Sequence, residues 1–160
     1  MQMALALSLE VAEAGGMTIL PDWSPRTVAV LSTVDPEPHA IPVSAPVRAG
    51  DRSILLSLRH DRGSLARLRA HSAVALTVLA GDDVAFTARG RARVEEEAMA
   101  EDPDYAAVRI EVDAIDDHRQ PAFAVTAGVD REWRDPAEQR ALGGRVQALS
   151  RRARAGAATA

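Results

Sequence analysis

The chain has 160 residues and a formal net charge of −4 at pH 7, with no cysteine and no lysine. Hydrophobic residues make up 47% of it and charged residues 26%, which is typical of a single globular domain. This composition excludes disulfides, thiolate catalysis, cysteine-ligated metals and Schiff-base chemistry on lysine. The acidic charge and the aromatic content of 3% also argue against nucleic acid or an anionic membrane as a main partner.

The first 25 residues are expected to form an N-terminal extension, and residues 26–160 the folded domain. Within the extension, residues 1–14 have the pattern of a short helix that ends at a pair of glycines. No basic residue precedes the apolar run at residues 3–9, so a signal peptide is not expected. No apolar run reaches the roughly 20 residues of a membrane span. We expect a cytoplasmic protein without a membrane partner.

Three extended segments open the domain. The first, residues 27–34, is rich in β-branched and aliphatic residues, which predicts a strand. The second, His39–Val47, contains Pro42 and Pro46, which restrict it to a sheet edge, a bulge or the mouth of a barrel. The third is Ser53–Leu58. Their short connections predict a β-meander.

Three further strands are predicted after a short amphipathic helix at residues 61–71. Ala73–Leu79 is nearly all apolar, which indicates a buried central strand. Val84–Val94 alternates between apolar and polar residues, as a long strand with one buried face does. Ala107–Ile115 alternates in the same way, and Phe123–Val125 gives a weaker strand signal.

A helix is predicted from Asp135 onward, because Asp135 is a typical N-cap and Pro136 a typical first helical residue. The earlier segment Glu95–Asp104 contains six carboxylates, which we interpret as a solvated loop or helix start rather than a metal site. Together the elements predict a mainly β fold, a barrel of antiparallel strands with one inserted helix and a C-terminal helix.

One cluster of polar residues is suited to binding an anion. Ser57, Arg59, Arg62 and Ser64 lie within eight positions, at the end of a strand and the start of the short helix. Hydroxyl, guanidinium and free helix N–H groups all donate hydrogen bonds to a phosphate. Ser64 or Asp61 is the expected cap of this helix. The cluster predicts a phosphate site, and the alternative is that both arginines are solvated.

Three segments resemble the pyridoxamine 5′-phosphate oxidase-like split β-barrels. Leu31–Asp35 followed by Pro38–Val43 is similar to the family's opening pattern "L-x-T-x-d…G-x-P-h-x-x-P-v". Leu68–Leu76 resembles its "L-x-x-n-P-x-V-a-L" segment, and Gly90–Val94 resembles the "G-x-A-x-V" of its long strand. The resemblance covers residues 26–115.

The resemblance implies a six-stranded antiparallel split barrel that forms a homodimer and binds FMN. In this family the flavin ring usually lies against the second strand, which corresponds here to Ile41, Pro42, Val43 and Ser44. The phosphate usually lies between the third strand and the helix start, so its position coincides with the anion cluster of Ser57, Arg59, Arg62 and Ser64. The resemblance therefore implies a flavin-dependent oxidoreductase that acts on a small-molecule substrate.

The sequence departs from the oxidases that act on vitamin B6. They carry a Ser-Arg-Lys run where this chain has Arg62–Ser64, and an arginine where it has Ile41. Their C-terminal substrate motif of arginine and histidine is also not visible. We therefore expect an oxidoreductase that does not oxidise vitamin B6 itself.

Two alternatives keep the same fold. A deazaflavin-dependent reductase would favour a basic groove for the polyglutamate tail of its cofactor, and Arg89, Arg91 and Arg93 on one strand face are candidates. The simpler interpretation is that these three arginines are solvated. A non-enzymatic flavin-binding or cofactor-free module would instead act as a sensor or partner protein. Fold alone does not choose between them, because one fold hosts many reactions.

Overall fold

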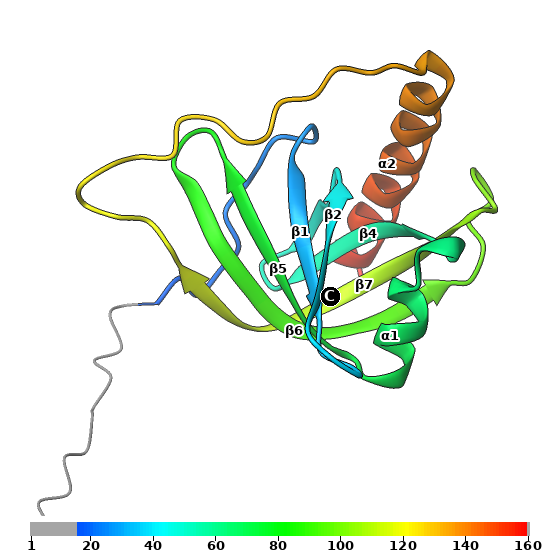
Figure 1. Cartoon of the computed structure of the whole chain (residues 1–160), viewed down its shortest axis with the longest axis horizontal. Helices are drawn as coiled ribbons and strands as arrows, with labels where there is room; N and C mark the ends of the chain where they lie inside the picture. The colour runs from blue at the N-terminus through cyan, green and yellow to red at the C-terminus, as the bar shows by residue number, and fades with distance from the viewer. Residues whose placement is uncertain (1–15, 160) are drawn as a thin grey trace, which may run out of the picture.

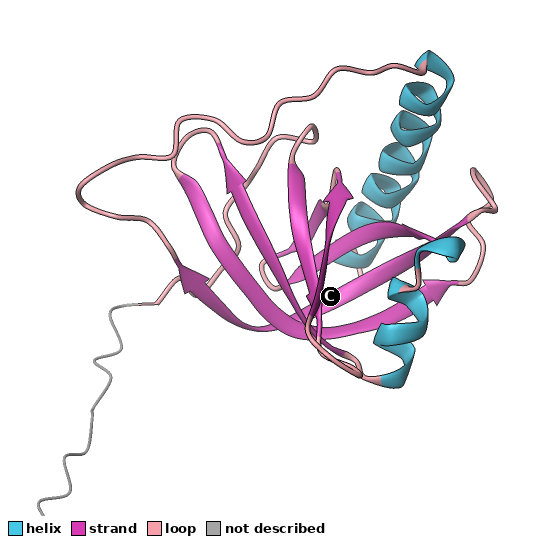
Figure 2. Cartoon of the chain, viewed as in Figure 1, coloured by secondary structure: helices cyan, strands magenta, loops and turns pink. Residues whose placement is uncertain are grey.

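A computed structural model of the chain describes residues 16–159, so the predicted helix at residues 1–14 lies outside the described residues. The chain forms one curled antiparallel sheet with two α-helices beside it (Figures 1 and 2). The strands are β1 (Val28–Thr33), β2 (His39–Ser44), β3 (Val47–Gly50), β4 (Ser53–Arg59), β5 (Ala73–Ala80), β6 (Val84–Glu96) and β7 (Tyr105–Asp117). The helices are the one-turn η1 (His60–Arg62), α1 (Ser64–Ala70) and α2 (Pro136–Ala157). The predicted mainly β fold with an inserted and a C-terminal helix is confirmed.

The long strands β6 and β7 form the centre of the sheet. The strand order is β2-β1-β5-β6-β7-β4-β3. Both central strands have 13 residues, and β6 alternates between buried apolar and exposed charged side chains as predicted. Their backbones approach closely at Gly90, where a Cβ atom would lie 2.0 Å from the carbonyl oxygen of Glu111. The register shift at this position therefore requires a glycine.

The curl of the sheet leaves a split between two open strand edges. In the described part of the chain, no strand pairs with the side of β2 that faces away from β1. β3 pairs with β4 only as far as Leu55, so Ser57–Arg59 is open on the same side of β4. β2 and β4 contact each other across the split. Open edges present unpaired backbone N–H and C=O groups, so the split offers hydrogen-bond donors and acceptors.

The sheet has seven strands rather than the predicted six. The segment predicted as one strand at His39–Val47 divides into β2 and β3 at Ala45, whose φ of 53° is left-handed. Pro46 follows and has no N–H to donate. The Ala45 N–H bonds instead to the Thr27 carbonyl at 2.8 Å, and the chain passes here from one edge of the sheet to the other.

Two apolar cores hold these elements together. The larger core fills the barrel around Phe86 and Leu31. Leu20 is buried in it, and the Trp23 ring packs 5.6 Å from that of Phe86, so the predicted extension contributes to the barrel from Met17 onward. The smaller core joins α2 to the sheet and consists of Leu55, Met99, Ala107, Ala148, Leu149 and Ala153.

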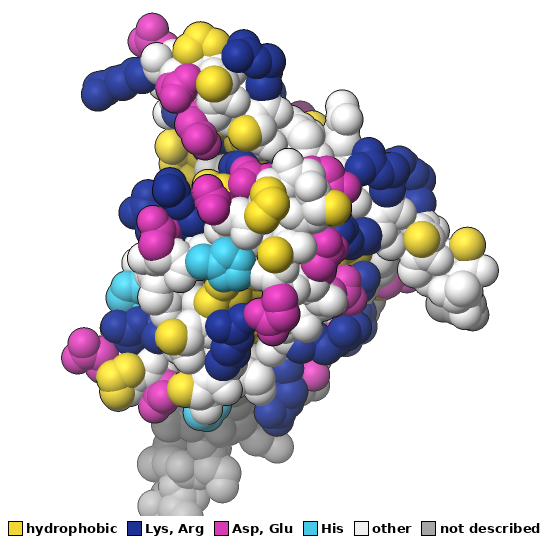
Figure 3. Space-filling view, turned by 90° about the vertical axis from the view of Figure 1, so that its right-hand side faces the viewer, with side chains coloured by type: hydrophobic (Ala, Val, Ile, Leu, Met, Phe, Trp, Pro, Cys, Tyr) yellow, Lys and Arg dark blue, Asp and Glu magenta, His cyan; other side chains and the backbone are white. Residues whose placement is uncertain are grey.

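Ion pairs connect α2 to the hairpin between β6 and β7. Within Glu95–Asp104, β6 continues to Glu96 and Met99 is buried, so this segment is a packed hairpin rather than the predicted solvated loop or helix start. Its carboxylates pair with arginines of α2: Asp102 with Arg145, Glu101 with Arg151 and Glu96 with Arg152. Figure 3 views the side that carries both helices and shows arginine and carboxylate side chains next to one another.

The segment between β7 and α2 crosses one end of the barrel (Figure 1). The predicted strand at Phe123–Val125 does not form, although Val125 exchanges two hydrogen bonds with Asp83, of 3.0 and 2.9 Å. α2 begins as predicted, with the Asp135 carboxylate accepting from the Ala137 N–H at 2.8 Å. No helix within residues 16–159 is long and apolar enough to cross a membrane.

Candidate functional site

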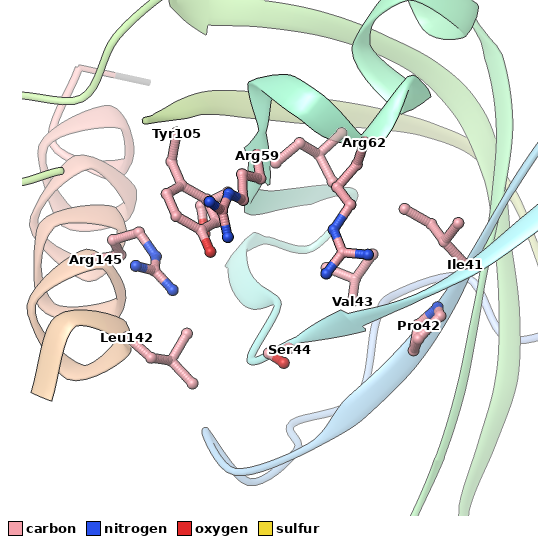
Figure 4. Close-up of a pocket in the computed structure, with 11 residues that line it drawn as sticks. Ile41, Pro42, Val43, Ser44, Arg59, Arg62, Tyr105, Leu142 and Arg145 are labelled. Atoms are coloured by element: carbon pink, nitrogen blue, oxygen red, sulfur yellow. The ribbon is translucent and has the colours of Figure 1, made fainter. Parts of the chain in front are cut away.

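A cavity of about 240 Å³ lies in the split between β2 and β4 (Figure 4). Seven of the eight residues predicted as cofactor ligands line it: Ile41, Pro42, Val43, Ser44, Ser57, Arg59 and Arg62. Leu58, Tyr105, Leu142 and Arg145 complete the lining. The structure therefore brings together two segments that the sequence analysis singled out separately.

The β2 wall of the cavity is held in place from behind. Val43 is buried in the barrel core and Ile41 packs against it, so the free edge of the strand is fixed toward the split. Pro42 is opposite Val30 in the register of β1 and β2. The Ser44 hydroxyl accepts a hydrogen bond from Nη1 of Arg131 at 2.7 Å, which ties the segment before α2 to the cavity wall.

The β4 wall carries two exposed arginines. η1 ends at Gly63, whose φ of 71° is left-handed and favours glycine. Arg59 Nε lies 3.2 Å from an oxygen of Asp61, but the two side chains are 45% and 64% exposed, so solvent screens this pair. Among residues 16–159 no carboxylate pairs with Arg62. Both guanidinium groups are therefore accessible to an anionic ligand.

Ser64, the eighth predicted ligand, does not line the cavity. The residue is fully buried, and its hydroxyl has no hydrogen-bond partner in the described part of the chain. Gly63 is the N-cap of α1, so the predicted cap by Ser64 or Asp61 is wrong. The left-handed turn at Gly63 places Ser64 on the side of Leu65, which is also buried.

Sequence reasoning missed the third wall, which α2 and the start of β7 provide. Arg145 is only 4% exposed, and its guanidinium lies 3.7 Å over the ring of Tyr105. Its Nη1 donates to Asp102, whereas its buried Nε has no partner in the described residues. A signal was present, because Leu142, Arg145 and Leu149 have the spacing of one helix face. An arginine in an apolar face therefore marked a site.

Perturbed carboxylates lie outside the cavity. A side-chain hydrogen bond from Arg119 lowers the pKa of Asp117 to about 2, and one from Arg89 lowers the pKa of Asp116. Both carboxylates are at the end of β7, whereas the cavity lining contains no Asp, Glu or His. The lining thus offers no side chain that titrates near neutral pH, and a reaction there depends on the chemistry of what the cavity binds.

The arginine face of β6 is not a uniformly basic groove. Arg89 pairs with Asp116 at 2.8 Å, and Arg93 lies 3.1 Å from Glu95. These carboxylates neutralise two of the three arginines considered for a polyglutamate tail. No group of three or more His, Asp or Glu side chains within residues 16–159 is arranged to hold a metal ion.

No protein-family model matches the sequence, and no curated protein matches it. HupZ from Group A Streptococcus is a solved structure with 15% identity and a TM-score of 0.51, and the match covers 64% of this chain and 90% of HupZ. A protein related to general stress protein 26 from Clostridium acetobutylicum, of the pyridoxinephosphate oxidase family, is 12% identical over 58% of this chain and 80% of its own, with a TM-score of 0.49. An FAD-binding protein from Mesorhizobium loti is 12% identical over 56% and 81%, with a TM-score of 0.46.

These matches concern the fold. The likeness to HupZ shows that the curled sheet and its connections occur in a solved protein. A structure of the pyridoxinephosphate oxidase family is also among the neighbours. The curled antiparallel sheet with its C-terminal helix is a split β-barrel.

Proposed function

We propose that this protein binds FMN in the cavity between β2 and β4 and acts as a flavin-dependent oxidoreductase. The observation that carries the proposal is the combination of two features in one cavity. Exposed arginines stand on one wall, and an open strand edge forms the other. A flavin mononucleotide needs both, because it joins a dianionic phosphate to a planar ring with a polar edge.

Arg59 and Arg62 would hold the phosphate. Their guanidinium groups form charge-assisted hydrogen bonds that match phosphate oxygens, and the Ser57 hydroxyl adds a donor on the same strand. The unpaired backbone groups of Ile41–Ser44 would contact the ring. Bound FMN supplies hydride and electron transfer, while the protein contributes binding, orientation and electrostatics. This division of roles suits a lining that contains no Asp, Glu or His.

A second copy of the chain would complete the site. The cavity volume of about 240 Å³ lies below the roughly 300–1,000 Å³ of typical ligand pockets, so one chain encloses only part of a flavin. Val30 and Leu79 are 42% and 49% exposed, and the register places both on the same outer face as Pro42 at the cavity rim. An apolar face of this kind favours association, and the proposed assembly is a homodimer.

The same cavity is also open to a deazaflavin, or to a flavin bound without turnover. The neutralised arginines of β6 make a polyglutamate groove on that face less favourable, so FMN is the first cofactor to test. At Ile41 and Arg62–Ser64 the sequence differs from the oxidases that act on vitamin B6, so vitamin B6 is not the proposed substrate.

The test is the absorbance spectrum of the purified protein, recorded before and after FMN is added and removed by desalting. We expect retained flavin bands, and we expect Arg62→Ala to weaken FMN binding roughly 10- to 100-fold, which corresponds to one charge-assisted hydrogen bond. Riboflavin, which lacks the phosphate, should bind both proteins equally. Arg91→Ala removes an exposed arginine that does not line the cavity and is the matched control.

Two outcomes would contradict the proposal. FMN that washes off the wild-type protein excludes it as a resident cofactor, and a deazaflavin titration then follows. Equal loss of FMN in the Arg62→Ala and Arg91→Ala variants would mean that the phosphate lies elsewhere. For the dimer, light scattering after gel filtration should give twice the mass of one chain, and Val30→Asp should reduce it.

A further inference from the structure

Arg145 is an unusual residue to find on the buried face of a helix. It lies between Leu142 and Leu149 on the side of α2 that packs against the sheet, and it is 4% exposed. Burial of a guanidinium costs free energy unless partners replace the lost water. Asp102 and the face of the Tyr105 ring are two such partners.

These two partners leave part of the guanidinium unsatisfied. The planar group has five N–H donors in a fixed arrangement. Asp102 accepts from Nη1, which leaves the edge formed by Nε and Nη2 outside this ion pair. The Nε atom is buried and has no hydrogen-bond partner among residues 16–159. A buried donor without a partner is uncommon in folded proteins and requires an explanation, of which a group bound beside it is one.

The residue that carries this unsatisfied donor also lines the cavity. Arg145 lines it together with Tyr105 and Leu142. In Figure 4 the Arg145 side chain reaches from α2 toward Tyr105, and Arg62 stands on the other side of the view. The lining thus contains guanidinium groups on two different walls and no carboxylate. The wall of β4 and η1 suits one anionic group, and the wall of α2 suits a second.

We propose that Arg145, oriented by Asp102 and Tyr105, binds the carboxylate of an organic substrate that occupies the α2 side of the cavity. This inference rests on the proposed function, in which the phosphate of FMN occupies the Arg59 and Arg62 side. The substrate class is therefore a small organic anion. Its apolar part contacts Leu142, and its carboxylate accepts from the free edge of Arg145.

Benzoate and benzyl alcohol are suitable probes, because they share an aromatic ring and differ in charge. Binding is measured on the full chain by calorimetry, without FMN and with FMN added, and by changes in flavin absorbance. We expect benzoate to bind and benzyl alcohol to bind at least tenfold more weakly. Arg145→Met, which keeps a flexible stem, should weaken benzoate binding at least tenfold and leave the affinity for FMN within about twofold.

Arg62→Ala is the matched variant on the opposite wall. It should weaken FMN binding and leave benzoate binding within about twofold. If Arg145→Met fails to fold because Asp102 is left unpaired, the double variant Arg145→Met with Asp102→Asn removes both charges and keeps the test possible. The variant Arg145→Lys should restore part of the affinity, since a lysine is charged but does not bind a carboxylate in a bidentate manner.

Three results would overturn the inference: equal binding of benzoate to wild type and to the Arg145 variants, equal binding of benzyl alcohol and benzoate, or displacement of FMN by benzoate. The last would place benzoate in the phosphate site. Benzoate binding that depends on Arg145 in a protein that does not take up FMN would refute the proposed function while supporting the anion site. The two failures are therefore distinguishable.

Discussion

α2 and the end of β4 with η1 form different walls of one cavity, and the arginines that these elements carry have different partners. Arg145, Arg151 and Arg152 each pair with a carboxylate of the β6–β7 hairpin. Arg59 has only the exposed Asp61, and no carboxylate of the described residues pairs with Arg62. The first group fastens a helix to the sheet, whereas the second leaves its charge available to a ligand.

The pairing of α2 with the β6–β7 hairpin connects two charged segments that lie far apart in the sequence. Three of the six carboxylates at Glu95–Asp104 pair with arginines of the C-terminal helix, about 50 residues away. Arg145 is the one member that belongs to both settings, because it is paired with Asp102 and also lines the cavity.

The largest expected effect removes the apolar attachment of α2. Leu149 is 1% exposed in the core that joins α2 to the sheet. Leu149→Ala should lower the free energy of unfolding by about 2–5 kcal/mol, as large-to-small substitutions in cores do. Urea denaturation measures it, and Gln147→Ala on the exposed side of α2 should change it by less than about 0.5 kcal/mol. Equal losses in both variants would mean that α2 is not anchored through this core.

The next largest effect tests whether a buried ion pair contributes more to the free energy of unfolding than an exposed one. Asp102→Asn leaves the buried Arg145 without its charge partner and should cost about 1.5–3 kcal/mol of stability. Glu101→Gln breaks the more exposed pair with Arg151 and should cost about 0–1 kcal/mol. Urea denaturation of both variants makes the comparison. An equal loss of stability in both variants would mean that burial does not make the Asp102–Arg145 pair the stronger one.

On the β4 wall the same kind of substitution should hardly affect folding. Arg62→Ala removes an exposed charge without an ion pair among residues 16–159, so the free energy of unfolding should change by less than about 0.5 kcal/mol. Thermal or urea denaturation without added cofactor checks this value. A loss above about 1 kcal/mol would show that Arg62 supports the fold, and the contrast between the two arginine groups would fail.

The smallest effect concerns an ion pair outside both groups. Arg119 lowers the pKa of Asp117 to about 2, below its unfolded value of about 3.9. The folded state therefore binds fewer protons, and the pair's stabilisation is present above about pH 4 and is lost as the pH falls toward 2. Asp117→Asn should be slightly less stable than wild type at pH 6, and the difference should shrink at pH 2–3 and in high salt. A difference that is independent of pH would exclude this pairing.

The parts of the fold that were predicted from the sequence depend on local signals. The cap at Asp135 and Pro136 is set by residues next to each other, and the alternation in β6 follows from one buried face. The cavity residues of β4 and η1 were predicted from a local cluster of hydroxyl and guanidinium groups, whereas those of β2 were predicted from the family resemblance. Those signals survive folding because few distant contacts compete with them.

The features that were missed depend on distant contacts or on a rare backbone conformation. The left-handed backbone conformation of an alanine has no sequence signature, so the division of the predicted strand at Ala45 was not predicted. The position of Arg145 on an apolar helix face was visible in the sequence, but its partners Asp102 and Tyr105 lie 40 or more residues earlier and could not be predicted. Ser64 was assigned to the site from its hydroxyl, its place at the helix start and the family resemblance, whereas in the structure it follows the left-handed Gly63 and is fully buried.

The two open strand edges also make the barrel sensitive to what fills the space between them. A molecule in the split contacts β2 and β4, which are held near one another by few other contacts, and it binds the folded chain only. Such a molecule stabilises the native state by RT ln(1 + [L]/Kd), about 2.7 kcal/mol at a hundredfold excess over Kd. The melting temperature therefore becomes a detector of ligands whose chemistry need not be known in advance. Flavins and organic acids could be ranked by the increase in melting temperature that each one produces.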